Sequence, residues 1–199
     1  RETLSLVKTR DNKPYFTDGD NNCWRMYDFI EDSICLELPE SNEDFYQCAV
    51  AFGKFQRFLD DFPVGELYET IPDFHNTPKR FADFTAAVSK DALGRAANVR
   101  EEIEFIKSRR DFYHVLIDNE KAGLLPRRVS HNDTKSNNVM LDSVTRTALC
   151  VIDLDTVMPG YSVTDFGDSI RFGASTAAED EKDLSKVHFS LEKFKTYAA

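Results

Sequence analysis

Residues 130–142 read SHNDTKSNNVMLD, and this polar run with an apolar tail constrains the fold more than any other stretch. Apolar segments lie on both sides of the polar residues, RRVS before them and NVMLD and ALCVIDL after them, and these predict short β-strands. The polar side chains therefore lie on a loop between strands. Such loops are common places for reactive groups, because the strands fix the geometry while the side chains stay accessible.

The spacing within this run suits phosphoryl transfer. Asp133 and Asn138 are five positions apart, and Asp153 follows fifteen residues later at the end of an apolar strand. Transfer from a nucleotide needs a carboxylate at the acceptor hydroxyl and hard oxygen ligands for one or two Mg²⁺ ions that hold the phosphates. The kinase arrangement has an Asp, an Asn five positions later and a second Asp beyond the next hairpin. Lys135 is placed to reach the transferred phosphate as a point charge.

A structural interpretation of the same residues has to be weighed against this one. Asp and Asn are common in turns because their side chains bond to nearby backbone groups, so the run could be only a polar hairpin loop. The combination of the five-residue spacing with a strand-ending Asp153 favours the functional interpretation. We expect His131 to hold the loop by hydrogen bonds rather than to act in catalysis.

The rest of the chain is predicted to be mainly helical. TLSLVKT and CWRMYDFI predict two strands of an N-terminal hairpin joined by a polar run. Apolar residues at helical spacing then predict a helix that is N-capped by Ser41 and ends before Pro63, a second that starts at Thr77 and Pro78, and a third over about 95–119. A last helix is predicted over the C-terminal run SKVHFSLEKFKTYAA, with Leu184, Val187, Leu191 and Phe194 on one face.

Composition excludes several classes of function. The net charge of −10 argues against binding to nucleic acid or to an anionic membrane, both of which need clustered Lys and Arg. Four cysteines without metal-ligand spacing are typical of free thiols in a reducing compartment, so we expect a cytoplasmic protein. No apolar stretch is long enough to span a membrane. Charge leaves a small neutral or cationic ligand open, and the oligomeric state is not predicted.

The two loop motifs carry a specific resemblance. SHNDTKSNNVMLD together with ALCVIDLDTVMPGYSVTDFGDSIRFGAS resembles the aminoglycoside phosphotransferase and choline kinase family, small-molecule kinases with a protein-kinase-like fold. The runs WRMYDFIEDS, FGKFQRFLDDFP and ETIPDFHNT are similar to the bacterial N-acetylhexosamine 1-kinase group of that family. The resemblance implies an α+β fold, consisting mainly of the helical C-terminal lobe with a remnant β-hairpin of the N-terminal lobe.

The resemblance also implies roles for single residues, with ATP and Mg²⁺ as cofactors. It makes Asp133 the catalytic base, with Lys135 beside it. Asn138 and Asp153 become Mg²⁺ ligands, and Asp155 an additional ligand or a substrate contact. The backbone near Asp28 and Ile30 corresponds to the hinge that meets adenine.

Asp165 begins the letters DFG, but we expect it to start a helix and to anchor the loop through backbone hydrogen bonds. Two elements of the family are not recognisable: a glycine-rich loop, and a strand lysine paired with a helix glutamate. We therefore expect residues 1–32 to be a remnant of the nucleotide lobe and hinge. Residues 33–199 are then the helical lobe, incomplete at its C-terminal end.

The function expected from these features is ATP- and Mg²⁺-dependent phosphorylation of a small molecule. The best acceptor is the anomeric hydroxyl of an N-acetylhexosamine, which gives the sugar 1-phosphate. One alternative is a kinase of choline, an amino alcohol or an aminoglycoside. A different class of alternative is an inactive fragment that only binds nucleotide.

Overall fold

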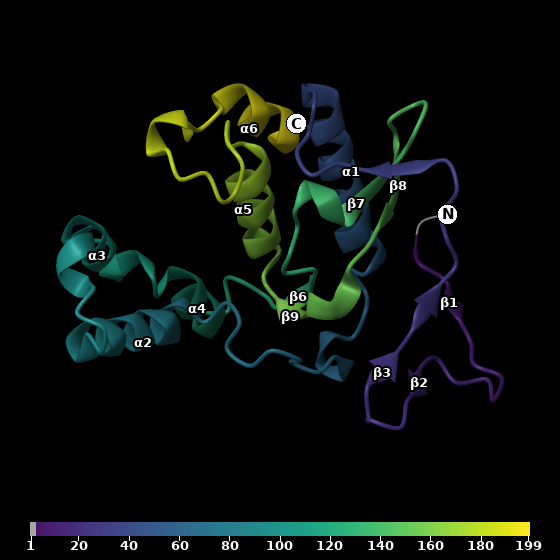
Figure 1. Ribbon diagram of the computed structural model, residues 1–199, viewed down its shortest axis with the longest axis horizontal. Helices are drawn as coiled ribbons and strands as arrows, with labels where there is room; N and C mark the ends of the chain where they lie inside the picture. The colour runs from purple at the N-terminus through teal and green to yellow at the C-terminus, as the bar shows by residue number, and fades with distance from the viewer. Residues whose placement is uncertain (1–2) are drawn as a thin grey trace.

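The computed structural model describes residues 3–199 and contains short antiparallel sheets surrounded by helices. The α-helices are α1 (Asn42–Phe58), α2 (Thr77–Lys90), α3 (Arg100–Lys107), α4 (Val115–Lys121), α5 (Ser162–Gly173) and α6 (Leu191–Ala198). Figure 1 shows α1, α5 and α6 around the strands at the centre, while α2, α3 and α4 extend to one side as a separate arm. No helix among residues 3–199 is long and apolar enough to cross a membrane.

The N-terminal strands pair only with each other. β1 (Leu6–Val7) pairs with β4 (Met26–Tyr27), which confirms the predicted hairpin. Within the connecting run, β2 (Phe16–Thr17) pairs with β3 (Cys23–Trp24) as a second small ribbon. Asp18 holds the turn between β2 and β3, because its carboxylate accepts hydrogen bonds from Asn22 and from the Trp24 ring. These bonds, the Trp24 bond first, lower the pKa of Asp18 to about 2.

The central strands form two further sheets. β5 (Ser33–Cys35), β7 (Val139–Asp142) and β8 (Ala148–Val151) make a three-stranded antiparallel sheet with β7 in the middle. β6 (Arg128–Ser130) pairs with β9 (Met158–Gly160) in a separate ribbon. The polar run at 130–138 therefore connects strands of two different sheets, which means that the hairpin-loop interpretation of it is wrong.

Helix α1 covers the three-stranded sheet and forms the core with it. Phe45 and Phe52 from α1 pack with Val139 and Leu141 from β7, and all four side chains are buried. The helix begins where the sequence predicts, because Ser41 accepts a hydrogen bond from the Asp44 N–H while the Asp44 carboxylate accepts one from the Ser41 N–H. This capping box satisfies two backbone donors that a helix start otherwise leaves unpaired.

The predicted helix over 95–119 is broken into shorter segments. A 3₁₀ turn at Ala96–Val99 precedes α3, and a second 3₁₀ turn at Arg110–Phe112 follows it. Helix α4 begins only after this second turn. The break follows from side chains that take over a backbone acceptor. The Phe105 carbonyl accepts hydrogen bonds from the Ser108 hydroxyl and the Arg109 guanidinium, while the Arg109 N–H turns to Ile106. Side chains that compete for helix carbonyls in this way end the helix.

The starts of the other two predicted helices agree with the structure to different degrees. Helix α2 begins at Thr77 as predicted, and Asn76 supplies its N-cap by accepting a hydrogen bond from the Lys79 N–H. The C-terminal helix begins only at Leu191, because residues 184–186 form a 3₁₀ turn and Phe189 makes a β-bridge with Ser175. The predicted apolar face from Leu184 onward is therefore not one helix face.

Gly173 near the end of α5 is required by the core. A Cβ at this position would overlap the ring of the buried Phe45. We expect Gly173→Ala to lower the free energy of unfolding by about 1–3 kcal/mol, the usual cost of overpacking a core. Urea unfolding monitored by circular dichroism measures this change.

Gly167 in the same helix provides the matched control. A Cβ there would meet nothing within 4 Å, so Gly167→Ala should only relieve the entropic cost of glycine in a helix and gain up to about 1 kcal/mol. Equal stability of the two variants would show that Phe45 moves aside without cost, contrary to this account.

Candidate active site

Side chains of helix α5 hold the loop over 131–138 in place. The buried carboxylate of Asp165 accepts hydrogen bonds from the backbone N–H groups of His131 and Asn132, both at 2.9 Å, and from the Gln56 amide at 3.2 Å. Burial raises the pKa of Asp165, while these donors act in the opposite direction. The expectations that DFG begins a helix and that Asp165 anchors the loop are confirmed.

A second set of hydrogen bonds, one turn further along α5, holds Thr134 of the loop. The Thr134 N–H donates to the Asp168 carboxylate at 2.9 Å, and the Thr134 carbonyl accepts from the Ser169 hydroxyl at 2.9 Å. Sequence reasoning missed Asp168 and Ser169. The signal was available, because positions three and four after Asp165 lie on the same helix face.

His131 acts within the loop as expected. Its ring is fully buried, lies edge-on to Phe52 and Phe55, and bonds through Nε2 to the Ile152 carbonyl at 2.9 Å. Its Nδ1 accepts a hydrogen bond from the Asp133 N–H at 3.3 Å. His131 thus ties the loop to the strand that leads to Asp153, which confirms a structural role.

Asp133 and Asn138 contact each other directly. The Asn138 amide nitrogen donates to the Asp133 carboxylate oxygen Oδ2 at 3.0 Å and to its carbonyl at 2.8 Å. With the nitrogen used in this way, the Asn138 amide oxygen accepts no hydrogen bond from residues 3–199. The five-residue spacing therefore produces an oriented carboxylate next to an amide oxygen that is available as a ligand.

A backbone hydrogen bond connects Asn138 to the residue that precedes Asp153. The N–H of Ile152 donates to the Asn138 carbonyl at 2.9 Å, which places the following residue, Asp153, next to Asn138. Asp153 is exposed, with left-handed backbone at φ 56°, a conformation that Asp tolerates better than most residues. A carboxylate and an amide oxygen are the hard ligands that Mg²⁺ prefers, so the donors present fit this ion. No group of three His, Cys, Asp or Glu side chains among residues 3–199 is arranged to hold a metal by itself.

Lys135 places a positive charge at the same end of the loop. Its ammonium lies 3.6 Å from Asp133 and 3.4 Å from Glu179, and 6.0 Å from the centre of the Phe172 ring. Partial burial opposes its charge, but the two carboxylates outweigh this effect and raise the pKa of Lys135. The side chain is therefore held as a cation near the carboxylate of Asp133.

The remaining predicted site residues lie toward the N-terminal strands. The Asp155 carboxylate forms an ion pair with Arg25, which links it to the segment between β3 and β4. The N–H of Asp28 donates to the Ser5 carbonyl, and the carbonyl of Ile30 accepts from the Ser33 hydroxyl. A metal role for Asp155 and a nucleotide role for Asp28 and Ile30 stay predictions.

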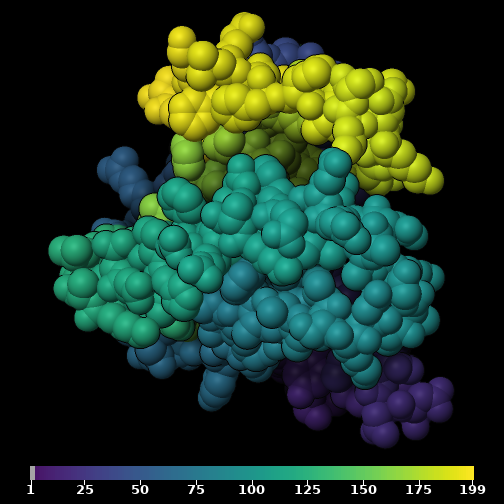
Figure 2. All heavy atoms as spheres, turned by 90° about the vertical axis from the view of Figure 1, so that its left-hand side faces the viewer, coloured from purple at the N-terminus to yellow at the C-terminus, as the bar shows by residue number. Residues whose placement is uncertain are grey.

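The arm formed by α2–α4 and the segment leading into α6 lie on two sides of α5. Figure 2 shows the arm in front and the C-terminal segment above it, with part of the α5 region visible between them. Glu179, which bonds to Lys135, belongs to this C-terminal segment and is also paired with Arg171 of α5. The loop is therefore bordered by acidic and basic groups from several elements.

Comparison with known proteins agrees with this architecture. Residues 10–191 match the model of the phosphotransferase enzyme family (APH). A solved structure described as the microcompartment-associated aminopropanol kinase is 15% identical in sequence, with a TM-score of 0.49. The match covers 99% of this chain but only 64% of that one. Helices around short antiparallel sheets are those of a kinase-like α+β fold, and the extent of the family match shows that the chain belongs to the phosphotransferase enzyme family.

Proposed function

We propose that this chain carries the catalytic loop of an ATP- and Mg²⁺-dependent kinase that phosphorylates a hydroxyl group of a small molecule. The observation that carries the proposal is the Asn138 side-chain amide. Its nitrogen bonds to Asp133 and its oxygen accepts no hydrogen bond from residues 3–199, while the Asn138 backbone carbonyl bonds to the residue before Asp153. One amide thus orients a base and presents a metal ligand. Membership of the phosphotransferase family supports the reaction class.

Each residue then has a distinct task. Asp133 accepts the proton of the acceptor hydroxyl, and the bond from Asn138 keeps its carboxylate in one orientation. The Asn138 oxygen and Asp153 would hold Mg²⁺, which would supply charge neutralisation on the phosphates of the nucleotide. Lys135, held as a cation by Asp133 and Glu179, attracts the transferred phosphoryl group.

The acceptor that we propose is an N-acetylhexosamine, phosphorylated at its anomeric hydroxyl. The resemblance of ETIPDFHNT and neighbouring runs to the hexosamine kinase group supports it. Phosphorus NMR of the products formed from ATP with a panel of hexosamines and amino alcohols tests it. A sugar 1-phosphate signal is the expected result, whereas phosphorylation of the amino alcohols alone would replace the sugar with an amino alcohol as substrate.

We also propose that residues 1–32 belong to the nucleotide lobe and hinge, and residues 33–199 to the helical lobe. The strand pairing supports this division among the described residues. β1 to β4 pair only with each other, whereas β5, starting at Ser33, joins β7 next to the catalytic loop. An ion pair between Arg25 and Asp155 connects the two parts.

A substitution at Asp153 tests the metal site. We expect Asp153→Asn to raise the Mg²⁺ concentration needed for half-maximal activity by roughly tenfold or more, because a charged ligand is lost. Initial rates over a Mg²⁺ titration at saturating ATP measure this change. An unchanged requirement would remove Asp153 from the metal site.

Two further variants complete this titration. Asp180→Asn removes an equally negative charge at an exposed position and should leave the Mg²⁺ requirement unaltered. Asp155→Asn decides whether the carboxylate paired with Arg25 is also a ligand, since only a ligand would shift the titration.

A further inference from the structure

A ring of charged side chains connects helix α5 and the segment after it to the catalytic loop. The Glu179 carboxylate bridges two cations: its Oε1 accepts a hydrogen bond from Arg171 at 2.8 Å, and its Oε2 lies 3.4 Å from the Lys135 ammonium. Arg171 in turn donates to Oδ1 of Asp168 at 2.9 and 3.0 Å. The other oxygen of Asp168 accepts the N–H of Thr134, the residue before Lys135, at 2.9 Å. The ring therefore begins and ends in the loop itself.

The segment that carries Glu179 is tethered at its base. Figure 1 shows it leaving the end of α5 and returning to α6. The Thr176 N–H donates to the His188 carbonyl at 3.0 Å, and the Ser190 N–H donates to the Ala174 carbonyl at 2.8 Å. These backbone bonds hold the two ends of the segment together. Glu179 is thus presented to the catalytic loop from a closed loop of chain.

Lys135 is shared between Glu179 and Asp133. Its ammonium lies 3.6 Å from Oδ1 of Asp133, longer than the roughly 2.7–3.2 Å of an N–H···O hydrogen bond. Oδ2 of the same carboxylate already accepts a bond from the Asn138 amide at 3.0 Å. Oδ1 is therefore the oxygen that remains for the proton of an acceptor hydroxyl.

Glu179 keeps the lysine from closing on this oxygen. The Lys135 side chain is only 27% exposed, so its charge needs a close counter-charge, and its long stem lets the ammonium move toward one. Among residues 3–199, Asp133 and Glu179 are the two carboxylates within 4.0 Å of it. Without the charge of Glu179, the ammonium would form a charge-assisted hydrogen bond with Oδ1. Both oxygens of the base would then be engaged.

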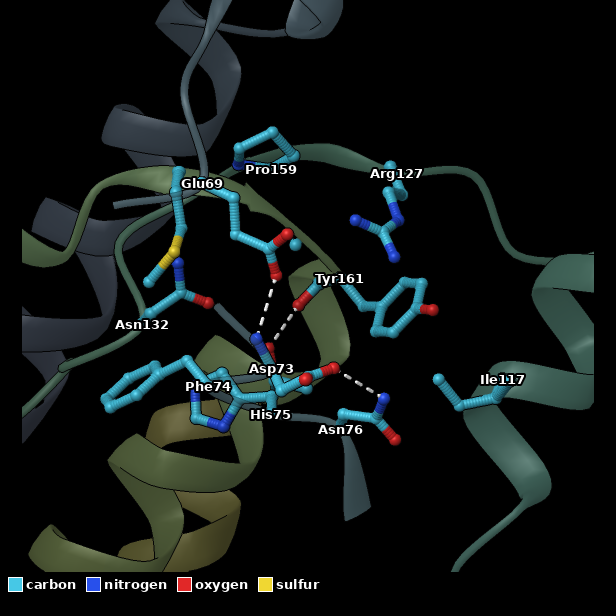
Figure 3. Close-up of a pocket in the computed structure, with 13 residues that line it drawn as sticks. Glu69, Asp73, Phe74, His75, Asn76, Ile117, Arg127, Asn132, Pro159 and Tyr161 are labelled. Carbon is cyan, nitrogen blue, oxygen red and sulfur yellow. Dashed lines mark hydrogen bonds between the residues drawn. The ribbon is translucent and has the colours of Figure 1, made fainter. Parts of the chain in front are cut away.

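The ring is distinct from the pocket beside Asn132. That pocket has a volume of about 70 Å³, and Figure 3 shows it between Asn132, the loop at 69–76 and the end of the β6–β9 ribbon. Neither Lys135 nor Glu179 lines it. A small molecule bound in that pocket would not replace Glu179 as the partner of Lys135.

We propose that Glu179 is a positioning residue for phosphoryl transfer, which holds the Lys135 ammonium between two carboxylates and leaves Oδ1 of Asp133 open to the acceptor hydroxyl. Arg171 fixes the direction of the Glu179 carboxylate, and Asp168 fixes Arg171. The inference rests on the proposed role of Asp133 as the base. It assigns a task to the segment between α5 and α6, which lies outside the loop motifs.

Glu179→Gln removes the charge but keeps an oxygen that can accept the bond from Arg171. We expect kcat/KM for the acceptor to fall by roughly three- to tenfold while the KM for ATP stays unchanged. The expected loss is moderate because Glu179 is 46% exposed and solvent screens its charge. Asp180→Asn, an exposed change of charge at the next residue, should alter neither constant. An unchanged kcat/KM for the acceptor, or an effect on the KM for ATP alone, would overturn the inference.

A double substitution shows whether Glu179 acts through Lys135. In Lys135→Met no ammonium remains that could close on Asp133. Adding Glu179→Gln to this variant should therefore change kcat/KM for the acceptor by less than about twofold. A further loss as large as that in the protein with Lys135 intact would mean that Glu179 acts independently, contrary to the inference.

NMR of the lysine ammonium groups in the ¹⁵N-labelled full chain separates failure of this inference from failure of the proposed function. The Lys135 signal, identified by its absence in Lys135→Met, should shift in Glu179→Gln and stay in place in Asp180→Asn. This comparison needs no turnover. A signal that Glu179→Gln leaves unmoved would overturn the positioning role. Absence of phosphoryl transfer by the unsubstituted protein would contradict the proposed function alone, because a shifted signal would still support the ion pair.

Discussion

Asp133→Asn is expected to lower turnover by roughly 10²-fold or more, the scale of a lost general base. The substituted amide still has an oxygen that can accept the bond from the Asn138 nitrogen, now 3.0 Å from the carboxylate. The geometry of the loop is therefore retained while the basic group is lost. Steady-state rates with saturating ATP and acceptor measure the effect.

Nucleotide binding should distinguish loss of the base from loss of structure. Asp133 does not anchor the loop, which is held by Asp165 and Asp168, so the variant should bind Mg·ATP as the unsubstituted protein does. Asp61→Asn, an exposed change of the same kind, is the control for the rate. Turnover within a factor of two of the unsubstituted protein would remove Asp133 from the role of base.

Local signals account for the parts of the fold that the sequence predicted correctly. Helix α1 begins at Asn42 because Ser41 and Asp44 cap each other, and both residues are three positions apart in the sequence. Asp133 and Asn138 meet through a turn of a few residues, which also makes their contact predictable from spacing. Where the interacting groups are close in sequence, residue type and spacing are sufficient.

Nonlocal pairing accounts for most of what could not be predicted. That β6 pairs with β9 and β7 with β5 depends on contacts between distant residues, and nothing in the short strands specifies these partners. The direction of the Asn132 amide follows from this pairing, since one of its bonds goes to Thr156 and its oxygen lies against Gly160. In the sequence, Asn132 is only one of several polar residues in a run. Its pocket becomes visible only when the ribbon and the loop at 69–76 are brought together.

The break in the third predicted helix has a different physical origin. The apolar spacing there is helical, and Ile103 of α3 is buried. The Ser108 hydroxyl and the Arg109 guanidinium nevertheless compete for the Phe105 carbonyl. Periodicity reports which face is buried, but it does not report whether a side chain will replace the backbone donor.

Asp165→Ala is expected to lower the free energy of unfolding by about 2–6 kcal/mol, because two buried N–H groups each lose a partner worth about 1–3 kcal/mol. These groups are the N–H donors of His131 and Asn132, both 2.9 Å from the carboxylate and both less than 6% exposed. Chemical unfolding measures the loss, and Asp180→Ala is the exposed control. Turnover should fall as well, since the two residues directly precede Asp133.

Asp165→Asn separates anchoring from a direct part in the chemistry. The amide can accept one of the two N–H bonds, but its own N–H₂ group then faces the other donor, so we expect a smaller cost of about 1–3 kcal/mol together with reduced turnover. If Asp165 anchors the loop, its substitution must lower stability and activity together, because the same hydrogen bonds position His131 and Asn132. A variant that melts like the unsubstituted protein and yet has no turnover would instead place Asp165 in the reaction itself.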